Sequence, residues 1–129
     1  HENEGIFRCL EIGSGKLQWE TAGITREELS NLKPGASDGD VIDKRSNKPV
    51  PWPFYGRASK ILADGKFIVL AERGGMMSLV KVDKTNYEEI SRCTIDGMKY
   101  PSWTAPVLSR GRLYLRCEDK LICLDLRAQ

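Results

Sequence analysis

The chain has 129 residues, 40% of them hydrophobic, and 20 Lys and Arg against 18 Asp and Glu leave a formal net charge of +2. This length suits a single domain, and the nearly even charge argues against nucleic-acid binding, which usually requires a strongly basic patch. The longest apolar run, residues 67–71, is no longer than one strand, so we expect no membrane-spanning segment. The polar residues 1–5 show no signal peptide in this chain.

The first predicted element is a β-hairpin. Residues 6–12 alternate apolar and polar types, and residues 17–20 form the return strand. The intervening Gly13-Ser14-Gly15-Lys16 predicts a tight turn, because glycine tolerates positive φ.

The strand pattern stops over residues 21–56. Thr25 is followed three residues later by Glu28, a capping-box pair that predicts a short helix from Thr25 to Leu32, ended by Pro34 and Gly35. Three prolines around Trp52 complete a long segment, which we expect to be an irregular insertion. Loops of this length in compact domains are uncommon and tend to be functional or disordered.

Regular strands resume at Ser59. Four consecutive strands are predicted over residues 59–63, 66–72, 77–83 and 88–95, and three more over residues 104–109, 112–118 and 121–126. Glycine-containing or polar turns separate most of them, as expected for hairpins.

An internal repeat links these strands. Residues 61–70 align with residues 107–116, 46 positions later, and each copy places a glycine and a basic residue before an apolar strand. Residues 79–83 resemble residues 122–126, and both resemble residues 8–12.

A period in the forties with four short strands per unit is typical of β-propeller blades. We therefore predict an all-β chain, a partial β-propeller of about two and a quarter four-stranded antiparallel blades with a long irregular insertion. As one propeller fragment it divides into residues 1–20 (the end of one blade), 21–56 (insertion), 57–97 (a full blade) and 98–129 (an incomplete last blade). The alternative is an ordinary antiparallel sandwich of the same strands.

The first hairpin carries a more specific signal. Residues 10–19 resemble the tryptophan-docking motif of pyrroloquinoline-quinone-like (PQQ-like) propeller repeats, through Glu11, Gly13, Gly15 and Trp19. The resemblance covers residues 1–20 and 57–129, including a blade entry at residues 1–5, but not the insertion. The second blade departs from the motif, since the position of its docking tryptophan is Ser91.

The resemblance implies a non-catalytic scaffold or protein-interaction module, exported to the periplasm or outside a bacterial cell. Its expected partners are another protein, the remaining blades or further copies of the chain, with no nucleic acid. The alternative is part of an exported quinoprotein-like oxidoreductase, or of another enzyme, whose active site lies in blades that this chain lacks. The chain has no adjacent cysteine pair and no recognisable central acidic site, so we expect no cofactor.

No familiar catalytic motif is present, and the single histidine is His1, so a catalytic triad within this chain is not expected. Asp38, Asp40 and Asp43 are the candidates for a metal site. An EF-hand starting at Asp38 would need Glu at its twelfth position, which is Pro49, so we favour a solvated loop.

Five aromatic residues lie outside the predicted strands and form the candidate binding surface: Trp52, Phe54, Tyr55, Tyr100 and Trp103. Aromatic anchors beside proline suit a recognition surface. The more ordinary interpretation, which the sequence favours, is that they fill the junctions between blades.

Four cysteines are present: Cys9, Cys93, Cys117 and Cys123. We expect buried or half-buried thiols within strands, because free cysteine packs like a small apolar residue. A Cys117–Cys123 disulfide across a hairpin is the alternative, which leaves the redox compartment open.

Overall fold

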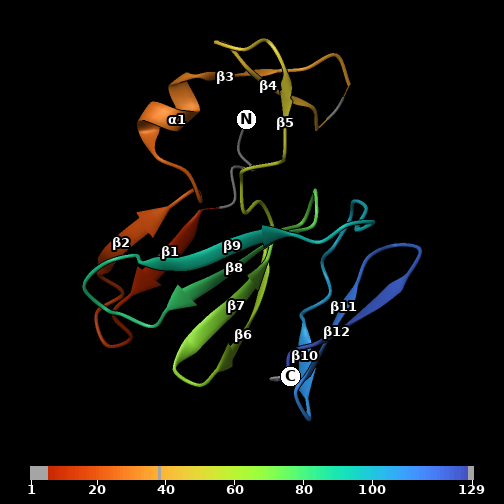
Figure 1. Ribbon diagram of the computed structural model, residues 1–129. Helices are drawn as coiled ribbons and strands as arrows, with labels where there is room; N and C mark the ends of the chain where they lie inside the picture. The colour runs from red at the N-terminus through yellow and green to blue at the C-terminus, as the bar shows by residue number, and fades with distance from the viewer. Residues whose placement is uncertain (1–5, 38, 128–129) are drawn as a thin grey trace.

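The computed structural model describes residues 6–37 and 39–127, so the blade entry expected at residues 1–5 lies outside the described residues. The described chain is almost entirely β (Figure 1). Its elements are β1 (Phe7–Leu10), β2 (Leu17–Thr21), α1 (Arg26–Ser30), β3 (Leu32–Pro34), β4 (Val41–Asp43), β5 (Pro49–Val50), β6 (Ser59–Ala63), β7 (Lys66–Leu70), β8 (Met76–Lys81), β9 (Glu89–Thr94), β10 (Val107–Ser109), β11 (Arg112–Arg116) and β12 (Leu121–Asp125).

These strands form four separate antiparallel sheets in sequence order: β1-β2, β3-β4-β5, β6-β7-β8-β9 and β10-β11-β12. The all-β prediction is confirmed, and each strand predicted outside the insertion is present with ends shifted by a few residues. Within the described ranges, no sheet closes on itself.

The insertion is more regular than the sequence predicts. The short helix is confirmed as α1, with Thr25 as its N-cap in a complete capping box with Glu28. The expectation of an otherwise irregular loop is wrong, because β3, β4 and β5 form a small sheet in which Val41 pairs with Val50. Strands of two or three residues are too short to show the alternation that identifies a strand in a sequence.

The repeat is visible in the backbone. The β6–β7 turn has Asp64 at φ 48° and Gly65 at φ 66°, and the β10–β11 turn has Arg110 at φ 49° and Gly111 at φ 75°. Two consecutive positive φ values are typical of type I′ hairpins, for which glycine is favoured. The strand pairing also agrees, because the partners of residues 61 and 63 recur 46 positions later, at residues 107 and 109.

The third strand of the repeat corrects the sequence alignment by one residue. Phe67 pairs with Val80, and Leu113, its counterpart, pairs with Leu124. Val80 therefore corresponds to Leu124, whereas the sequence alignment of residues 79–83 with 122–126 matched it to Cys123. The error has consequences, because a shift of one residue moves every side chain of a strand to the opposite face.

Strand β7 is buried on both faces. Ile68 and Leu70 lie in a cluster with Leu113 and Leu115 of the last sheet. On the other face, Val69 belongs to a cluster that reaches the first hairpin. Because neighbouring residues of a strand point to opposite faces, the short run from Ile68 to Ala71 supplies both cores at once.

The two cores use the same face of successive sheets. In the central sheet, Phe67, Val69, Ala71 and Val80 face the first hairpin. Their counterparts in the last sheet, Leu113, Leu115, Cys117 and Leu124, face the central sheet. The sheets therefore pack head to tail in one direction, which is a heterologous arrangement that continues until it closes or is capped.

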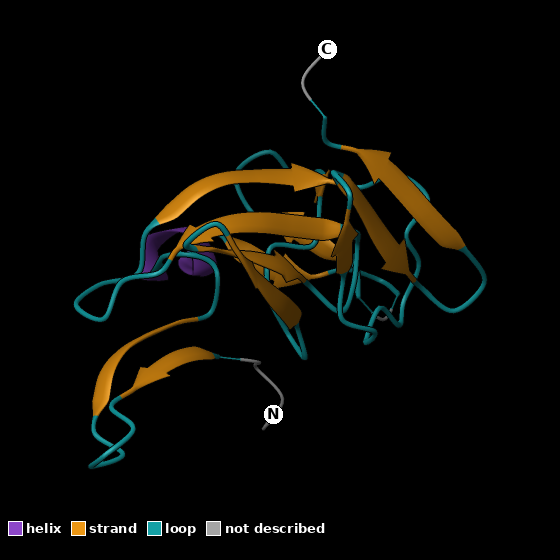
Figure 2. Cartoon of the chain, turned by 90° about the horizontal axis from the view of Figure 1, so that it is seen from below, coloured by secondary structure: helices purple, strands orange, loops and turns teal. Residues whose placement is uncertain are grey.

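The views agree with this order of sheets. The hairpin of β1 and β2, the central sheet of β6 to β9 and the last sheet of β10 to β12 follow one another across the molecule (Figures 1 and 2). In Figure 1 the insertion lies above the first hairpin and the central sheet. Among the described residues, no helix has the length and apolar character required to cross a bilayer.

Leu70→Ala should lower the free energy of unfolding by about 2–5 kcal/mol, because it opens a cavity between fully packed sheets. Leu70 is 0% exposed, whereas Leu62 in the neighbouring strand is 63% exposed and is the matched control. Denaturant unfolding measures both variants, and Leu62→Ala should change stability by about 0.5 kcal/mol or less. Equal losses in the two variants would contradict a core built around β7.

Candidate functional site

Four of the five predicted surface aromatics are brought together. The rings of Trp52 and Phe54 lie 5.1 Å apart, and those of Tyr100 and Trp103 lie 5.9 Å apart, centroid to centroid. Arg73 joins the two pairs, because its guanidinium lies 5.1 Å from the centroid of Trp52 and 4.1 Å from that of Tyr100. Contacts of this kind are favourable and fix the orientation of the rings.

Tyr55 is the exception. Its side chain is only 1% exposed and packs in the core beside Val69, so it does not belong to a binding surface and instead agrees with the junction-filling interpretation that the sequence favours. Sequence alone places it beside Phe54, but its ring contacts Phe7 at 5.9 Å and thereby helps to join the first hairpin to the central sheet.

Trp103 is held firmly although half of it is exposed. Its indole Nε1 donates to Glu72 at 3.2 Å, and its backbone oxygen accepts a hydrogen bond from Ser59 at 2.7 Å. The guanidinium of Arg57 lies 5.9 Å from the ring centroid. We call the set Phe54, Trp52, Arg73, Tyr100, Trp103 and Arg57 the Arg–aromatic strip.

Close backbone approach fixes the middle of the strip. Gly74 has φ 70°, and a Cβ built on it would lie 2.7 Å from the Cβ of Trp52. A Cβ built on Gly39 would lie 2.0 Å from Nη1 of Arg73. Gly74 therefore leaves the space beside the Trp52 backbone that any other residue would fill, whereas the flexible Arg73 side chain could move away from a Cβ at position 39.

The strip continues into a groove of the insertion of about 490 Å³. Its lining is mainly apolar and includes Leu29, Leu32, Pro34, Val41, Trp52 and Phe54. The indole Nε1 of Trp52 is buried and has no hydrogen-bond partner within residues 6–37 and 39–127.

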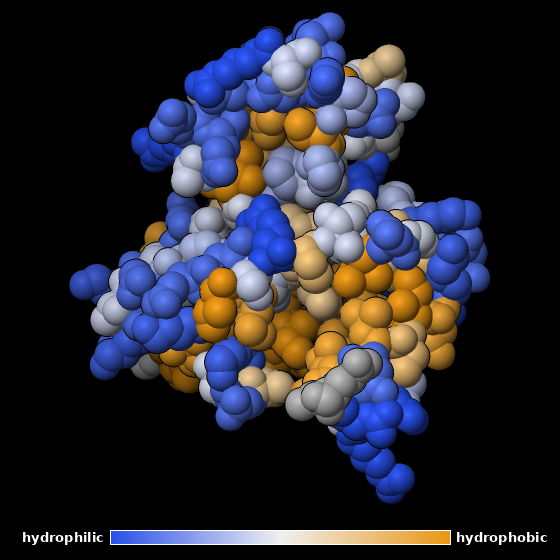
Figure 3. Space-filling model, in the orientation of Figure 1, coloured by the Kyte–Doolittle hydropathy of each residue, from blue (hydrophilic) through white to orange (hydrophobic). Residues whose placement is uncertain are grey.

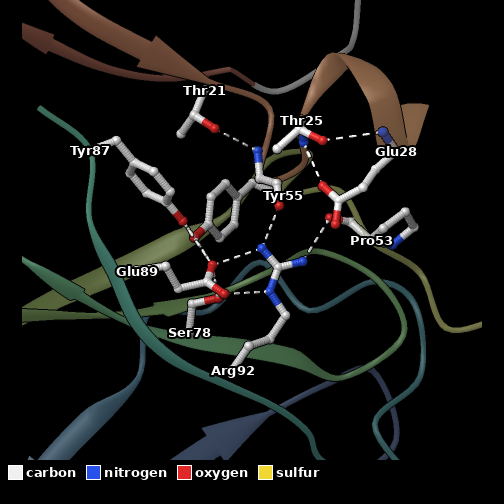
Figure 4. A network of polar contacts seen from close by, with 10 residues as sticks. Thr21, Thr25, Glu28, Pro53, Tyr55, Ser78, Tyr87, Glu89 and Arg92 are labelled. Carbon is white, nitrogen blue, oxygen red and sulfur yellow. Dashed lines mark hydrogen bonds and ion pairs between the residues drawn. The ribbon is translucent and has the colours of Figure 1, made fainter. Parts of the chain in front are cut away.

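A second cluster, which the sequence did not identify, lies at the neck of the insertion (Figure 4). Arg92 of β9 donates to the backbone oxygens of Gly23 and Pro53, and the latter bond is 3.2 Å long. Gly23 lies where the chain enters the insertion and Pro53 where it returns. The two chain segments of the neck are also joined directly, since the backbone N–H of Tyr55 donates to the backbone oxygen of Ala22 at 3.3 Å.

Glu89 positions Arg92 for this role. Its carboxylate accepts hydrogen bonds from Arg92 at 2.9 and 2.7 Å, from the Tyr87 hydroxyl at 2.8 Å and from Ser78 and Tyr55, each at 3.1 Å. The hydroxyls of Tyr55 and Tyr87 also contact each other, and because each has one proton, the one that donates to its neighbour does so in place of Glu89. A bidentate arginine–carboxylate pair gives both charge neutralisation and a fixed geometry.

The pKa shifts at the neck favour anchoring over acid–base catalysis. Burial alone would raise the pKa of Glu89, but hydrogen bonds from Arg92 and Tyr87 lower it overall. Burial raises the pKa of Tyr55, and burial together with bonds to Tyr55 and Glu89 raises that of Tyr87. A general base works best with a pKa near the operating pH; Glu89 stays ionised and paired, and the tyrosines stay protonated.

The neck borders an open pocket of about 540 Å³, lined in part by Tyr87, Glu89, Arg92, Thr25 and Glu28. Glu28 is engaged in the capping box of α1, and Glu89 is paired to Arg92. The two carboxylates in the pocket wall therefore already have hydrogen-bonding or ionic partners within the chain. No residue type or spacing marked this cluster in the sequence, because Glu89 and Arg92 look like ordinary polar positions of a strand.

The two metal-site candidates that the structure describes, Asp40 and Asp43, each accept local hydrogen bonds. Asp38 lies outside the described residues, Asp40 accepts a bond from Ser37 N at 3.3 Å, and Asp43 accepts bonds from the backbone and hydroxyl of Ser46 at 2.6 and 2.8 Å. The bonds from Ser46 lower the pKa of Asp43. Over the described part of the chain, no group of three or more His, Cys, Asp or Glu is placed to hold a metal ion.

The four cysteines are free thiols, so the alternative of a Cys117–Cys123 disulfide has no counterpart here. Cys117 is buried and Cys9 half-buried, as expected. Cys93 and Cys123 are exposed, which contradicts the expectation. Cys123 pairs with Tyr114 on the outer face of the last sheet, whereas Cys93 pairs with Met77 on the face of the central sheet that meets the last sheet.

The hairpin motif works as a docking device. Glu11 N donates to Lys16 O at 2.9 Å and Gly15 N to Glu11 O at 2.8 Å, closing the turn that contains Gly13. Trp19 then donates its indole N–H to Asp83 O at 3.0 Å, across to the central sheet. Ser91, at the corresponding place in the central sheet, is exposed.

Comparison of this chain with protein-family models and with curated proteins finds no match. The case for a function therefore depends on the geometry described above.

Arg92→Met should lower the free energy of unfolding by about 3 kcal/mol, because it leaves the half-buried Glu89 carboxylate without its ionic partner. Hydrogen exchange at residues 22–24, 54 and 55 should also become faster, because the neck loses two bonds. Arg112→Met, which replaces an exposed arginine of β11, is the control. Unchanged exchange at the neck in Arg92→Met would contradict the anchoring role.

Glu89 should contribute to the acid sensitivity of the fold. Its pKa in the folded chain lies below the ordinary 4.5, so its stabilisation is present above that value and is lost as the pH falls through the lowered one. Between about pH 6 and pH 3, the wild-type unfolding free energy should therefore fall more steeply than that of Glu89→Gln. Other carboxyls with a lowered pKa are present in both proteins. If the two unfolding free energies fall in parallel with pH, Glu89 does not contribute to the acid sensitivity.

Proposed function

We propose that this chain is a non-catalytic scaffold whose sheets are successive blades of a β-propeller of the PQQ-like repeat type. The observation that carries the proposal is the head-to-tail packing, in which equivalent faces meet at two successive sheet interfaces. Blades of a propeller are related in this way, by a constant step from one sheet to the next. An ordinary sandwich packs two sheets face to face, so it does not form successive interfaces from equivalent faces of successive sheets.

The docking tryptophan supports the same proposal. Trp19 closes its hairpin and donates to Asp83 O of the next sheet, as expected for a residue whose role is to join neighbouring blades. In the PQQ-like repeats that the chain resembles, the motif has this place. The resemblance also implies an exported protein, so we propose a location outside the cytoplasm.

The outer face of the last sheet is the place where the array would continue. Val107 and Leu121 on this face are 56% and 66% exposed, beside Tyr114 and the exposed Cys123. Their counterparts in the central sheet, such as Ile61 and Ile68, are covered by the last sheet. Apolar residues reach the surface over this sheet (Figure 3), and an apolar face of this kind favours association.

Light scattering during gel filtration tests the proposal. The 129-residue chain, of 14.5 kDa, should elute as a stable multiple of that mass, because further sheets are needed to cover the last one. Val107→Lys combined with Leu121→Lys should shift the chain toward the monomer. Leu29→Lys, which charges an apolar position of α1 that is 43% exposed, is the control. A folded wild-type monomer at all concentrations would contradict the stacking proposal.

A further inference from the structure

Two large aromatic side chains, Trp103 and Tyr100, are partly exposed at the surface. Trp103 is 50% exposed and Tyr100 is 43% exposed, and their rings meet edge to face. Neither is loose, since Glu72 and Ser59 hold Trp103 and Arg73 lies over Tyr100. Fixed aromatics with exposed area lose little entropy on binding, which is the property of interface hot spots.

Arg57 supplies the charge of this surface. It is exposed, and apart from its position over Trp103 it makes no hydrogen bond or ion pair with the described residues. Arg57 and Trp103 stand 46 positions apart, at the same place before the first strand of their sheets. The connections that lead into two neighbouring sheets therefore meet here, and they put a free guanidinium beside an exposed indole.

We propose that Trp103, Tyr100 and Arg57 bind an acidic segment of a protein partner. A carboxylate of the segment pairs with Arg57 in the bidentate geometry that guanidinium favours. A neighbouring aliphatic or proline side chain covers the rings of Trp103 and Tyr100. The inference deepens the scaffold function and depends on it only for the assumption that the role of the protein is to bind another.

The charges around the rings favour isolated carboxylates over a polyphosphate chain. The carboxylate of Glu72 bonds directly to the Trp103 indole and remains half-exposed. It disfavours a dense row of negative charges on that ring, whereas one carboxylate at Arg57 avoids it. The net charge of the chain is only +2, well short of the strongly basic surface that nucleic acid binding uses.

Fluorescence anisotropy with labelled peptides tests the proposal at any assembly size. The probe is fluorescein-Ser-Glu-Leu-Pro-Leu-Ser-Ser-amide, whose peptide has one carboxylate, and its charge-reversed match is fluorescein-Ser-Lys-Leu-Pro-Leu-Ser-Ser-amide. The acidic peptide should bind at least tenfold more tightly than the basic one. Arg57→Ser should weaken the acidic peptide about tenfold, as expected for the loss of one charged hydrogen-bonding partner, and Trp103→Ala should weaken it at least as much.

The control is Arg26→Ser, which removes an exposed arginine of α1 outside the strip and should leave the affinity within about twofold. Circular dichroism confirms that each variant is folded; if Trp103→Ala is not, Arg57→Ser decides alone. Equal binding of both peptides, no effect of Arg57→Ser, or equal affinity for a twelve-residue oligothymidylate would each overturn the proposal. The mass measurement above does not depend on this surface, so the two proposals fail separately.

Discussion

The structure depends on the burial of β7 from both sides. A strand that is buried on one face only can leave its other face to solvent. Strand β7 cannot, because it places Ile68 and Leu70 in one core and Val69 in the other. Each core then requires a neighbouring sheet, and the repeat supplies it with the same set of positions each time. The direction of stacking follows from this requirement, since the face that receives a sheet differs from the face that contacts the preceding one.

The insertion is attached to this stack by polar contacts. Arg92 reaches both ends of the neck, and Glu89 holds Arg92 in place with help from three hydroxyl groups. The network suits anchoring, because the Glu89 carboxyl is ionised and the tyrosine hydroxyls are protonated. The neck also leads directly into the segment that carries Trp52 and Phe54, which line the groove of the insertion.

Prediction from the sequence succeeded where the signal is periodic or local. Strands β6 to β12 have alternating or doubly apolar residues and glycine-containing or polar turns, and the capping box at Thr25 located α1 to within two residues. It failed for β3 to β5, whose strands are too short to alternate visibly, and it shifted the third strand of the repeat by one residue because apolar residues there occur on both faces. Tyr55 could not be separated from Phe54, since the Tyr55 side chain is directed by contacts with residues more than thirty positions away, whereas the ring of Phe54 contacts the nearby Trp52.

The neck has a consequence for how the chain tolerates change. Gly23 and Pro53 are joined to the same guanidinium, so the ends of the insertion are held together independently of what lies between them. The entropy of closing a loop grows only slowly with its length, and the central sheet receives no strand from residues 24–52. The length and sequence of this segment can therefore change at little cost to the stacked sheets.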